Sequence, residues 1–329
     1  MIPSVPSSPG SFSPEAQSLW FPPRRAAFAP GDLVLLITTD QSRYLQTVQP
    51  GQELHTHQGI FPHDSIVGQS AGTALAGTLG HSALILEPTL DDLMRHLKRG
   101  SQVIYPKDAA WLVHRLSLRA GSTVIEAGTG SGGLTTALAW AVAPGGKVFT
   151  YEMREDAFRI ARRNLERVGL LPHVQMHLGA IEDGFQQSNV DALFLDVRNP
   201  WEYMAQVRAA LKPGGCFAAL VPTTNQVSSL LETMEASGFA DIAVEELLMR
   251  AWKPVPDRLR PQDTMPAHTG FLIFGRVLAD VADAGRWLGK SRQRYLARVQ
   301  AAEEYAADAE ARERRTNPEG RKYPPLPLP

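Results

Sequence analysis

The sequence predicts an α/β protein in which a small all-β domain precedes a larger domain built on a mostly parallel sheet. From residue 123 onward, short β-branched runs alternate with segments of helical apolar spacing. A glycine-rich turn follows the first of these runs. Between residues 29 and 80, short strand-like runs are instead separated by glycines and polar turns, which is typical of an all-β domain.

The N-terminal part divides into a leader and the small β domain. Residues 1–28 are rich in Pro and Ser, so we expect a disordered leader, and their scarcity of acids leaves an organellar transit peptide as the alternative. Strand-like runs follow at Leu33–Thr38, Arg43–Val48 and Glu53–Thr56. Histidines gather in and next to this domain, at His55, His57, His63 and His81. They lack a cysteine or a carboxylate cluster beside them, so we expect no metal site.

A helical linker opens the larger domain, which we expect to span residues 81–278. Thr89 can cap a helix over Leu90–Lys98. The basic end of this helix carries Arg95, His96, Lys98 and Arg99. It is interpreted as a solvated face, with an RNA-facing patch as the alternative. The polar and aromatic string Q-V-I-Y-P-K-D, Gln102–Asp108, lies just before the glycine-rich turn and is a candidate to close over a bound cofactor.

The glycine-rich turn predicts a nucleotide-like cofactor site. A strand at Thr123–Ile125 leads into E-A-G-T-G-S-G-G, and a helix begins near Leu134. Glycines let a ligand approach the bare backbone, and the start of the helix offers unpaired N–H groups. The spacing of Gly128, Gly130 and Gly133 also matches a dinucleotide fingerprint, so NAD or FAD remains an alternative, as does a turn without a ligand.

Two acids favour S-adenosylmethionine (SAM) over a dinucleotide. Glu126 lies beside the glycines, where it would repel a pyrophosphate but attract the sulfonium and ammonium of SAM. Glu152 ends the next strand, Gly146–Tyr151, 20 residues after Gly132, where recognition of a ribose requires an acid. We therefore predict SAM as the cofactor.

Later strands bring further polar residues to the same edge of the sheet. The strands are predicted at Val174–Leu178, Ala192–Leu195 and Cys216–Val221. Glu182 or Asp183, after the first of these, can meet an adenine amino group, and ordinary turn acids are the alternative. Asp196 ends the second strand and precedes V-R-N-P-W, which places an acid and Trp201 beside the cofactor.

The loop after the third of these strands is P-T-T-N-Q-V, residues 222–227. Its Thr224 and Asn225 can hydrogen-bond a base or ribose, although capping of the next helix explains part of the pattern. Two closing strands, Ala243–Leu248 and Gly270–Val277, complete seven, with a long loop between them that contains His268. Residues 279–329 are expected to form a charged helical and Pro-rich tail.

The composition of the chain says more about its cellular compartment than about its function. The chain has 329 residues, a net charge of −1 and one cysteine, so any RNA surface must be a local patch and no intrachain disulfide can form. No apolar run reaches about 18 residues, and the N-terminus lacks a secretory pattern. We expect a cytoplasmic protein without a membrane anchor. Cys216 is interpreted as a packing residue rather than a reactive thiol.

Several separated strings resemble the bacterial and archaeal tRNA adenine-N1 methyltransferases that act at position 58 of the T-loop. They are G-D-L-V-L-L at Gly31, H-T-H-Q-G at His55, P-T-L-D-D at Pro88, Q-V-I-Y-P-K-D at Gln102, E-A-G-T-G-S-G at Glu126, Y-E at Tyr151, L-D-V-R-N-P-W at Leu195, P-T-T-N-Q-V at Pro222 and H-T-G-F-L at His268. The resemblance covers about residues 30–278. It implies a class I SAM-dependent methyltransferase fold, Rossmann-like with a seven-stranded mostly parallel sheet, a small N-terminal β-barrel, a tRNA substrate and a homotetramer.

The predicted site residues come from the patterns described above, and the resemblance adds the roles of some of them. The cofactor set is Gln102, Tyr105, Glu126, Gly128, Gly130, Ser131, Gly132, Gly133, Leu134, Glu152, Glu182 and Asp196, and the substrate set is Trp201, Thr224, Asn225 and His268. Within these sets, residues 131–134 would line the methionine and ribose of SAM, Glu152 would hold the ribose hydroxyls, and Asp196 would be the catalytic acid that meets both SAM and the target adenine. Ala267 replaces a glycine that is common in the family, so the path of that loop can differ.

The expected reaction is in-line attack of adenine N1 on the SAM methyl carbon. N1 already has a lone pair, so Asp196 is expected to accept a hydrogen bond from the exocyclic amine as positive charge grows on the ring. Two alternatives remain. One is a tRNA-binding subunit without catalysis, and the other is a SAM methyltransferase with a small-molecule or protein acceptor. The intact glycine turn and the retained acid argue against the first, and the strings outside the cofactor site argue against the second.

Overall fold

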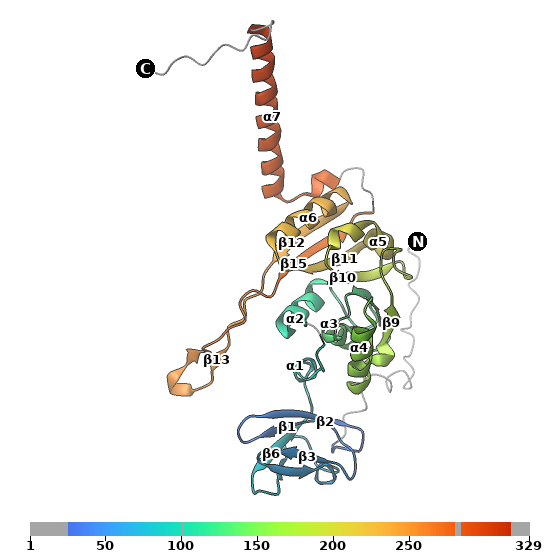
Figure 1. Ribbon diagram of the computed structural model, residues 1–329, viewed down its shortest axis with the longest axis vertical. Helices are drawn as coiled ribbons and strands as arrows, with labels where there is room; N and C mark the ends of the chain where they lie inside the picture. The colour runs from blue at the N-terminus through green and yellow to red at the C-terminus, as the bar shows by residue number, and fades with distance from the viewer. Residues whose placement is uncertain (1–25, 101, 280–283, 317–329) are drawn as a thin grey trace, which may run out of the picture.

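The computed structural model describes residues 26–100, 102–279 and 284–316 (Figure 1). Most of the predicted disordered leader and the Pro-rich end of the chain lie outside these residues. In the described part, no helix has the length and apolar character needed to cross a membrane.

The N-terminal residues form a small β domain around one core. Strands β1 Leu33–Thr38, β2 Arg43–Thr47, β5 Ala74–Ala76 and β6 Ser82–Leu86 make an antiparallel sheet in the order β2-β1-β6-β5, and β3 Glu53–Thr56 pairs with β4 Gly59–Pro62. Phe61 and Ile85 are fully buried between them. Phe28 also packs in this core, and β6 extends the domain past residue 80.

Two helices connect this domain to the larger sheet. Helix α1, Leu90–Arg95, starts with a capping box in which Thr89 and Asp92 satisfy each other's backbone N–H groups. The other oxygen of Asp92 accepts a hydrogen bond from Arg43 of β2 at 2.8 Å, which fixes the linker to the β domain. Helix α2, Pro106–Arg115, begins with proline at a position where no backbone donor is needed.

The larger domain contains the predicted seven-stranded sheet. Its order is β12-β15-β11-β10-β7-β8-β9. The strands are β7 Thr123–Ala127, β8 Lys147–Glu152, β9 Val174–Leu178, β10 Val190–Leu195, β11 Leu211–Val221, β12 Phe239–Glu245 and β15 Phe271–Val277. The β7 to β11 pairings are parallel, and β15 runs antiparallel to both β11 and β12. The predicted fold is therefore confirmed.

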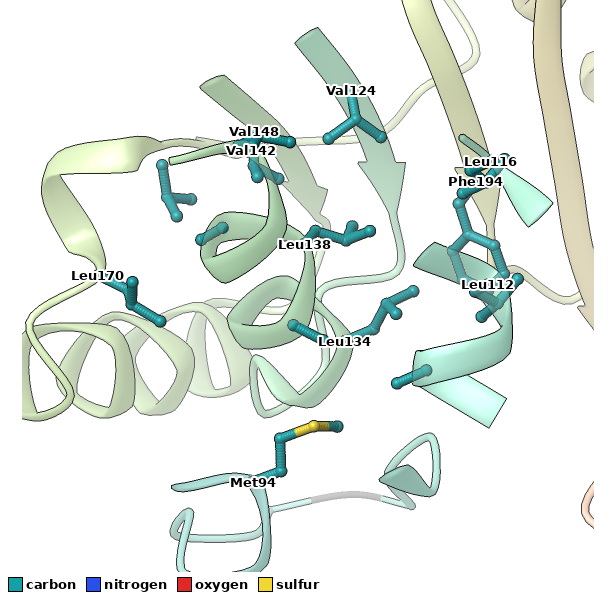
Figure 2. Packing of buried hydrophobic residues seen from close by; sticks show 14 of the residues in the cluster. Met94, Leu112, Leu116, Val124, Leu134, Leu138, Val142, Val148, Leu170 and Phe194 are labelled. Atoms are coloured by element: carbon teal, nitrogen blue, oxygen red, sulfur yellow. The ribbon is translucent and has the colours of Figure 1, made fainter. Parts of the chain in front are cut away.

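Helices cover both faces of this sheet. The covering helices are α3 Gly133–Val142, α4 Glu155–Arg167, α5 Met204–Ala210 and α6 Thr224–Ala236. Figure 2 shows α3 placing Leu138 and Val142 against Val124 and Val148 of the central strands. The next residue of β7, Ile125, belongs to the core on the opposite face, under α5 and α6. This alternation fixes which side chain of each strand faces which helix layer.

Three segments differ from the sequence interpretation: β11, the long loop, and β12, which spans Phe239–Glu245 rather than Ala243–Leu248. β11 begins at Leu211 rather than Cys216, because Leu211 pairs with Val190 across an irregularity in the ladder. The predicted long loop contains a hairpin of β13 Trp252–Lys253 and β14 Arg260–Pro261, and it projects away from the sheet as an arm (Figure 1). Helix α7, Lys290–Thr316, extends from the opposite end of the molecule. Short 3-10 turns occur at His63–Ser65, Leu171–His173, Pro200–Tyr203, Pro256–Arg258 and Ala284–Trp287.

Candidate active site

A pocket of about 480 Å³ opens where the carboxyl ends of β7, β8, β9 and β10 meet. β7 and β10 are neighbours in the sheet although β8 and β9 separate them in the chain, so the strand order reverses here. Open α/β sheets bind ligands at such a point. Of the predicted site residues, the pocket lining includes Gln102, Gly128, Gly130, Glu152, Glu182 and Asp196.

Gly128 joins the glycine turn to the end of β10. Its φ is +95°, and a Cβ placed on it would lie 2.2 Å from the carbonyl oxygen of Asp196. The N–H of Asp196 donates to the carbonyl of Ala127 at 2.8 Å, which closes the same contact from the other side. The glycine is therefore required by the approach of the protein's own backbone, in addition to any approach of a ligand.

Glu152 is held at the pocket wall by backbone donors. Its Oε2 accepts from the N–H of Gly130 at 2.9 Å, and its Oε1 accepts from the N–H of Arg154 at 2.9 Å. The side chain is 7% exposed. Each carboxylate oxygen keeps a further lone pair, so a bound hydroxyl donor can be accepted without breaking either contact.

Asp196 faces the pocket from the end of β10. Its side chain is reached by solvent from the pocket, but protein atoms surround it on the other sides. This desolvation, with a smaller contribution from the charge of Glu152, raises the pKa of Asp196 to about 6. The carboxylate is ionised at neutral pH and becomes protonated in mildly acidic solution.

The structure does not bring Glu126 to the pocket lining. The carboxyl group is 1% exposed and lies under α3, where its Oε2 accepts hydrogen bonds from Thr135 at 2.6 Å and Thr150 at 2.7 Å. Burial, helped by the charges of Asp196 and Glu152, raises its pKa to about 7 against the opposing effect of the two threonine hydrogen bonds. Glu126 thus joins α3 to the sheet from within, and its expected contact with SAM has no support in this geometry.

The remaining predicted cofactor residues do not line the pocket. Gly132 precedes the first residue of α3 with a φ of +80°, and Gly133 begins the helix. Ser131 accepts a hydrogen bond from the N–H of Gly100 at 3.0 Å, and Leu134 packs in the core. Tyr105 lies at the start of α2 and is 37% exposed.

Several lining residues were missed by sequence reasoning. They lie on the segments that follow β8 and β10, with the last two in the 3-10 turn Pro200–Tyr203, and they are Met153, Arg154, Val197, Asn199, Glu202 and Tyr203. Tyr203 donates a hydrogen bond to Glu182 at 3.2 Å, which links the segment after β10 to the segment after β9. For Met153, Arg154 and Val197, the position next to a correctly predicted strand end was the available signal, whereas Glu202 and Tyr203 lie too far beyond β10 for that signal.

The predicted substrate residues lie on segments that adjoin the pocket. Trp201 packs against the core under α5. Thr224 and Asn225 are exposed at the start of α6, and the side chain of Gln226 donates to the carbonyl of Arg198 at 3.2 Å. The 222–227 loop is therefore joined to the segment that follows Asp196.

His268 has partners on both ring nitrogens. Nδ1 lies 2.7 Å from a carboxylate oxygen of Glu246, and Nε2 lies 3.0 Å from the carbonyl oxygen of Pro222. Both partners are acceptors, so this arrangement requires a proton on each nitrogen. The hydrogen bond to Glu246, followed by that to Pro222, accordingly raises the pKa of His268.

A buried ion pair lies beside His268. Lys107 Nζ donates to Asp108 at 2.7 Å, to Thr269 at 2.7 Å and to the carbonyl of Leu247 at 2.9 Å, while Thr269 donates to the second oxygen of Asp108 at 2.8 Å. The charged side chains are 6% and 2% exposed. The Q-V-I-Y-P-K-D string is thereby attached to both ends of the arm. Among the described residues, no three His, Cys, Asp or Glu side chains gather as a metal site would require.

Comparison with known proteins agrees with this geometry. A family described as "tRNA methyltransferase complex GCD14 subunit" matches residues 82–268, which is more than half of the chain. The chain belongs to this family. A second family description, "TrmI-like N-terminal", matches residues 27–75.

Individual relatives match about three quarters of the chain. The tRNA (adenine(58)-N(1))-methyltransferase TrmI of Thermus thermophilus is 34% identical over 245 residues, which is 74% of this chain and 96% of the relative. The crystal structure of the tRNA (m1A58) methyltransferase TrmI from Aquifex aeolicus is 33% identical with a TM-score of 0.67, covering 77% of this chain and 100% of that one. A Thermotoga maritima structure described as a SAM-dependent O-methyltransferase is 40% identical with a TM-score of 0.73, covering 78% of this chain and 96% of that one.

Proposed function

We propose that this chain transfers the methyl group of SAM to N1 of adenine 58 in the T-loop of tRNA, giving N1-methyladenosine. The observation that carries the proposal is Asp196, an acid that faces the pocket and is fixed by backbone contact to the cofactor turn. Membership of the family supports the tRNA substrate, and the match of both domains supports it further.

The pocket suits SAM in size and charge. Its volume of about 480 Å³ lies within the range of small-molecule sites. Four acids, Glu152, Glu182, Asp196 and Glu202, outnumber two arginines, Arg154 and Arg198, in its lining, which favours a cation over a dinucleotide phosphate. In this proposal Glu152 accepts the ribose hydroxyls, and Glu182, oriented by Tyr203, lies near the adenine of SAM.

Asp196 acts on the acceptor by its charge. When bound, SAM supplies an electrophilic methyl carbon on a sulfonium. Adenine N1 forms a bond to that carbon while the carbon–sulfur bond breaks, so the positive charge passes from sulfur to the adenine ring. The ionised Asp196 accepts a hydrogen bond from the exocyclic amine and stabilises this charge, and no proton need be removed before attack. Positioning supplies the rest of the catalysis.

The acceptor base must be exposed from the T-loop before it can reach Asp196. We propose that Trp201, Thr224 and Asn225 receive it, because their segments adjoin the segment after Asp196. His268 has both nitrogens engaged, so its proposed role is to hold the 222–227 loop through Pro222 rather than to contact the base.

The proposal includes a homotetramer in the cytoplasm. The single cysteine of the sequence fits a reducing compartment. Mass photometry of the purified protein tests the assembly, and a tetramer mass is the expected result.

A methyl-transfer assay tests the function. Labelled SAM and unmodified tRNA are incubated with the protein, and the product nucleoside is identified and mapped. We expect N1-methyladenosine at position 58, lost in Asp196→Ala and retained in Asp183→Ala, whose exposed acid lies outside the pocket lining. SAM binding without tRNA methylation would refute the substrate, and an O-methylated product would point to another acceptor.

A further inference from the structure

Helix α7 leaves the body of the protein as a single long helix (Figure 1). It lies outside the residues matched by the family descriptions. Near its start, the guanidinium of Arg292 contacts both carboxylate oxygens of Glu235 on α6, with Nε 2.9 Å from one and Nη2 2.8 Å from the other. This ion pair joins the start of α7 to α6.

One face of α7 has two basic residues in its first half, two alanines in its middle and two acidic residues in its second half. The face consists of Lys290, Arg294, Ala297, Ala301, Glu304 and Asp308, all exposed. The steps between them are four, three, four, three and four residues, which keeps them on one side of an α-helix. Arg292 lies two residues from Lys290, a rotation of about 200°, so this face points away from the contact with α6.

Three of the four charges on this face are not compensated along their own helix, whereas Asp308 has Arg312 four residues further on in the sequence. Lys290 lies one turn from Arg294, and Glu304 lies one turn from Asp308, so like charges adjoin at both ends. Pairs of this kind destabilise an isolated helix. Neither Arg294 nor Glu304 has an opposite charge three or four residues away in the sequence. The side chain of Glu304 accepts a hydrogen bond from Gln300 at 3.0 Å, which leaves its charge unneutralised.

We propose that α7 pairs in antiparallel orientation with α7 of a second copy of this chain. Alignment of the two helices in opposite directions places Lys290 opposite Asp308 and Arg294 opposite Glu304, and by symmetry each pairing occurs twice. Ala297 then lies opposite Ala301, where two small side chains let the backbones approach. A parallel pair would instead place each charge opposite its own copy.

RNA is a less suitable occupant of this face. The basic half could approach phosphates, but Glu304 and Asp308 continue the same face and would repel them. Antiparallel pairing uses both halves, whereas an RNA strand along the helix would use one.

Disulfide trapping in the full-length protein tests the pairing. Cys216, the single native cysteine, is buried, so introduced cysteines report the contact. The double variant Ala297→Cys/Ala301→Cys should give a covalent dimer under mild oxidation. Ala297→Cys alone should give little, because its two copies would be offset by about 6 Å along the axis. Equal cross-linking of the single variant, or none of the double variant, would overturn the proposal.

A charge exchange provides the second test. In the double-cysteine background, Arg294→Glu should lower the cross-linked fraction about tenfold or more, because it faces Glu304 of the other copy. Adding Glu304→Arg should restore the cross-link. Cross-linking that ignores both substitutions would overturn the pairing. Loss of tRNA affinity in Arg294→Glu, with no recovery of cross-linking in the double exchange, would assign the face to RNA instead.

Discussion

Substitution of Gly128 by alanine tests whether the glycine turn and Asp196, the proposed catalytic acid, are positioned by one backbone contact. The added Cβ would lie 2.2 Å from the carbonyl oxygen of Asp196, whereas ordinary contact begins at 3.4 Å. The two segments must therefore separate by about 1.2 Å (3.4 − 2.2) in that direction. A displacement of about 1 Å at a reacting group lowers turnover by about 100-fold.

Stability should fall as well, from two separate causes. The left-handed backbone at Gly128 costs a residue with a side chain about 1 to 2 kcal/mol. The overlap with Asp196 adds about 1 to 3 kcal/mol. Gly121→Ala is the matched control, because Gly121 has a φ of +87° and open space around its Cβ position. It should carry the first cost alone and keep normal turnover.

The assay is methyl transfer to tRNA under saturating SAM, with denaturant unfolding measured in parallel. Both variants are compared with the parent protein at a temperature at which all three are folded. If Gly128→Ala kept the turnover of Gly121→Ala, the contact would not set the position of Asp196.

Three further perturbations follow from the site. The kcat/KM of methyl transfer should rise with pH through about 6 as Asp196 ionises. Asp196→Asn should be slower and lack this rise. If Asp196→Asn kept the same pH profile, the rise would belong to another ionisable group. The pKa of Glu126 is about 7 in the folded protein against an ordinary 4.5, so between these pH values the folded state binds a proton that the unfolded state has lost. The free energy of unfolding should therefore fall by about 3 kcal/mol as the pH rises from 4.5 to 7. In chemical unfolding, Glu126→Gln should remove this dependence of stability on pH. Lys107→Met should lower the free energy of unfolding by about 3 to 5 kcal/mol, because it leaves the buried Asp108 without its charged partner. Arg162→Met, which breaks an exposed ion pair, should lower it by less than about 1 kcal/mol. Similar losses of stability in both variants would refute the argument from burial.

The strand, turn and helix of the cofactor region were predictable because their signals are local. β-branched residues, then glycines, then an Ala/Leu-rich segment specify β7, the turn and α3 without reference to the rest of the chain. The acids at strand ends were predictable for a related reason, since parallel strands bring their carboxyl ends to one edge.

The orientation of Glu126 was misread although a signal existed. Side chains alternate along a strand, so Glu126 shares a face with Val124, which packs under α3. Thr150 lies directly opposite Glu126 on the neighbouring strand, and Thr135 reaches it from the first turn of α3. The interpretation from charge alone did not anticipate that the carboxyl group is buried between these two threonines.

Contacts between distant segments could not be predicted. Gly128 and Asp196 are separated by two intervening strands, and their approach depends on the crossover that places β10 beside β7. The contacts of His268 with Glu246 and Pro222 depend in the same way on the antiparallel return of β15. Sequence spacing carries no information about such pairs.

The contacts of the Lys107 ammonium group affect which changes in the length of the arm the fold can tolerate. It binds the carbonyl of Leu247 and the hydroxyl of Thr269, so one group closes the root of the whole arm. With the root closed, the entropy of the chain beyond it depends only weakly on length. Insertions, deletions or a proteolytic cut near the tip should therefore leave the ladder of β12 and β15 in register, and the arm becomes a place where the sequence can change length while the cofactor pocket stays the same.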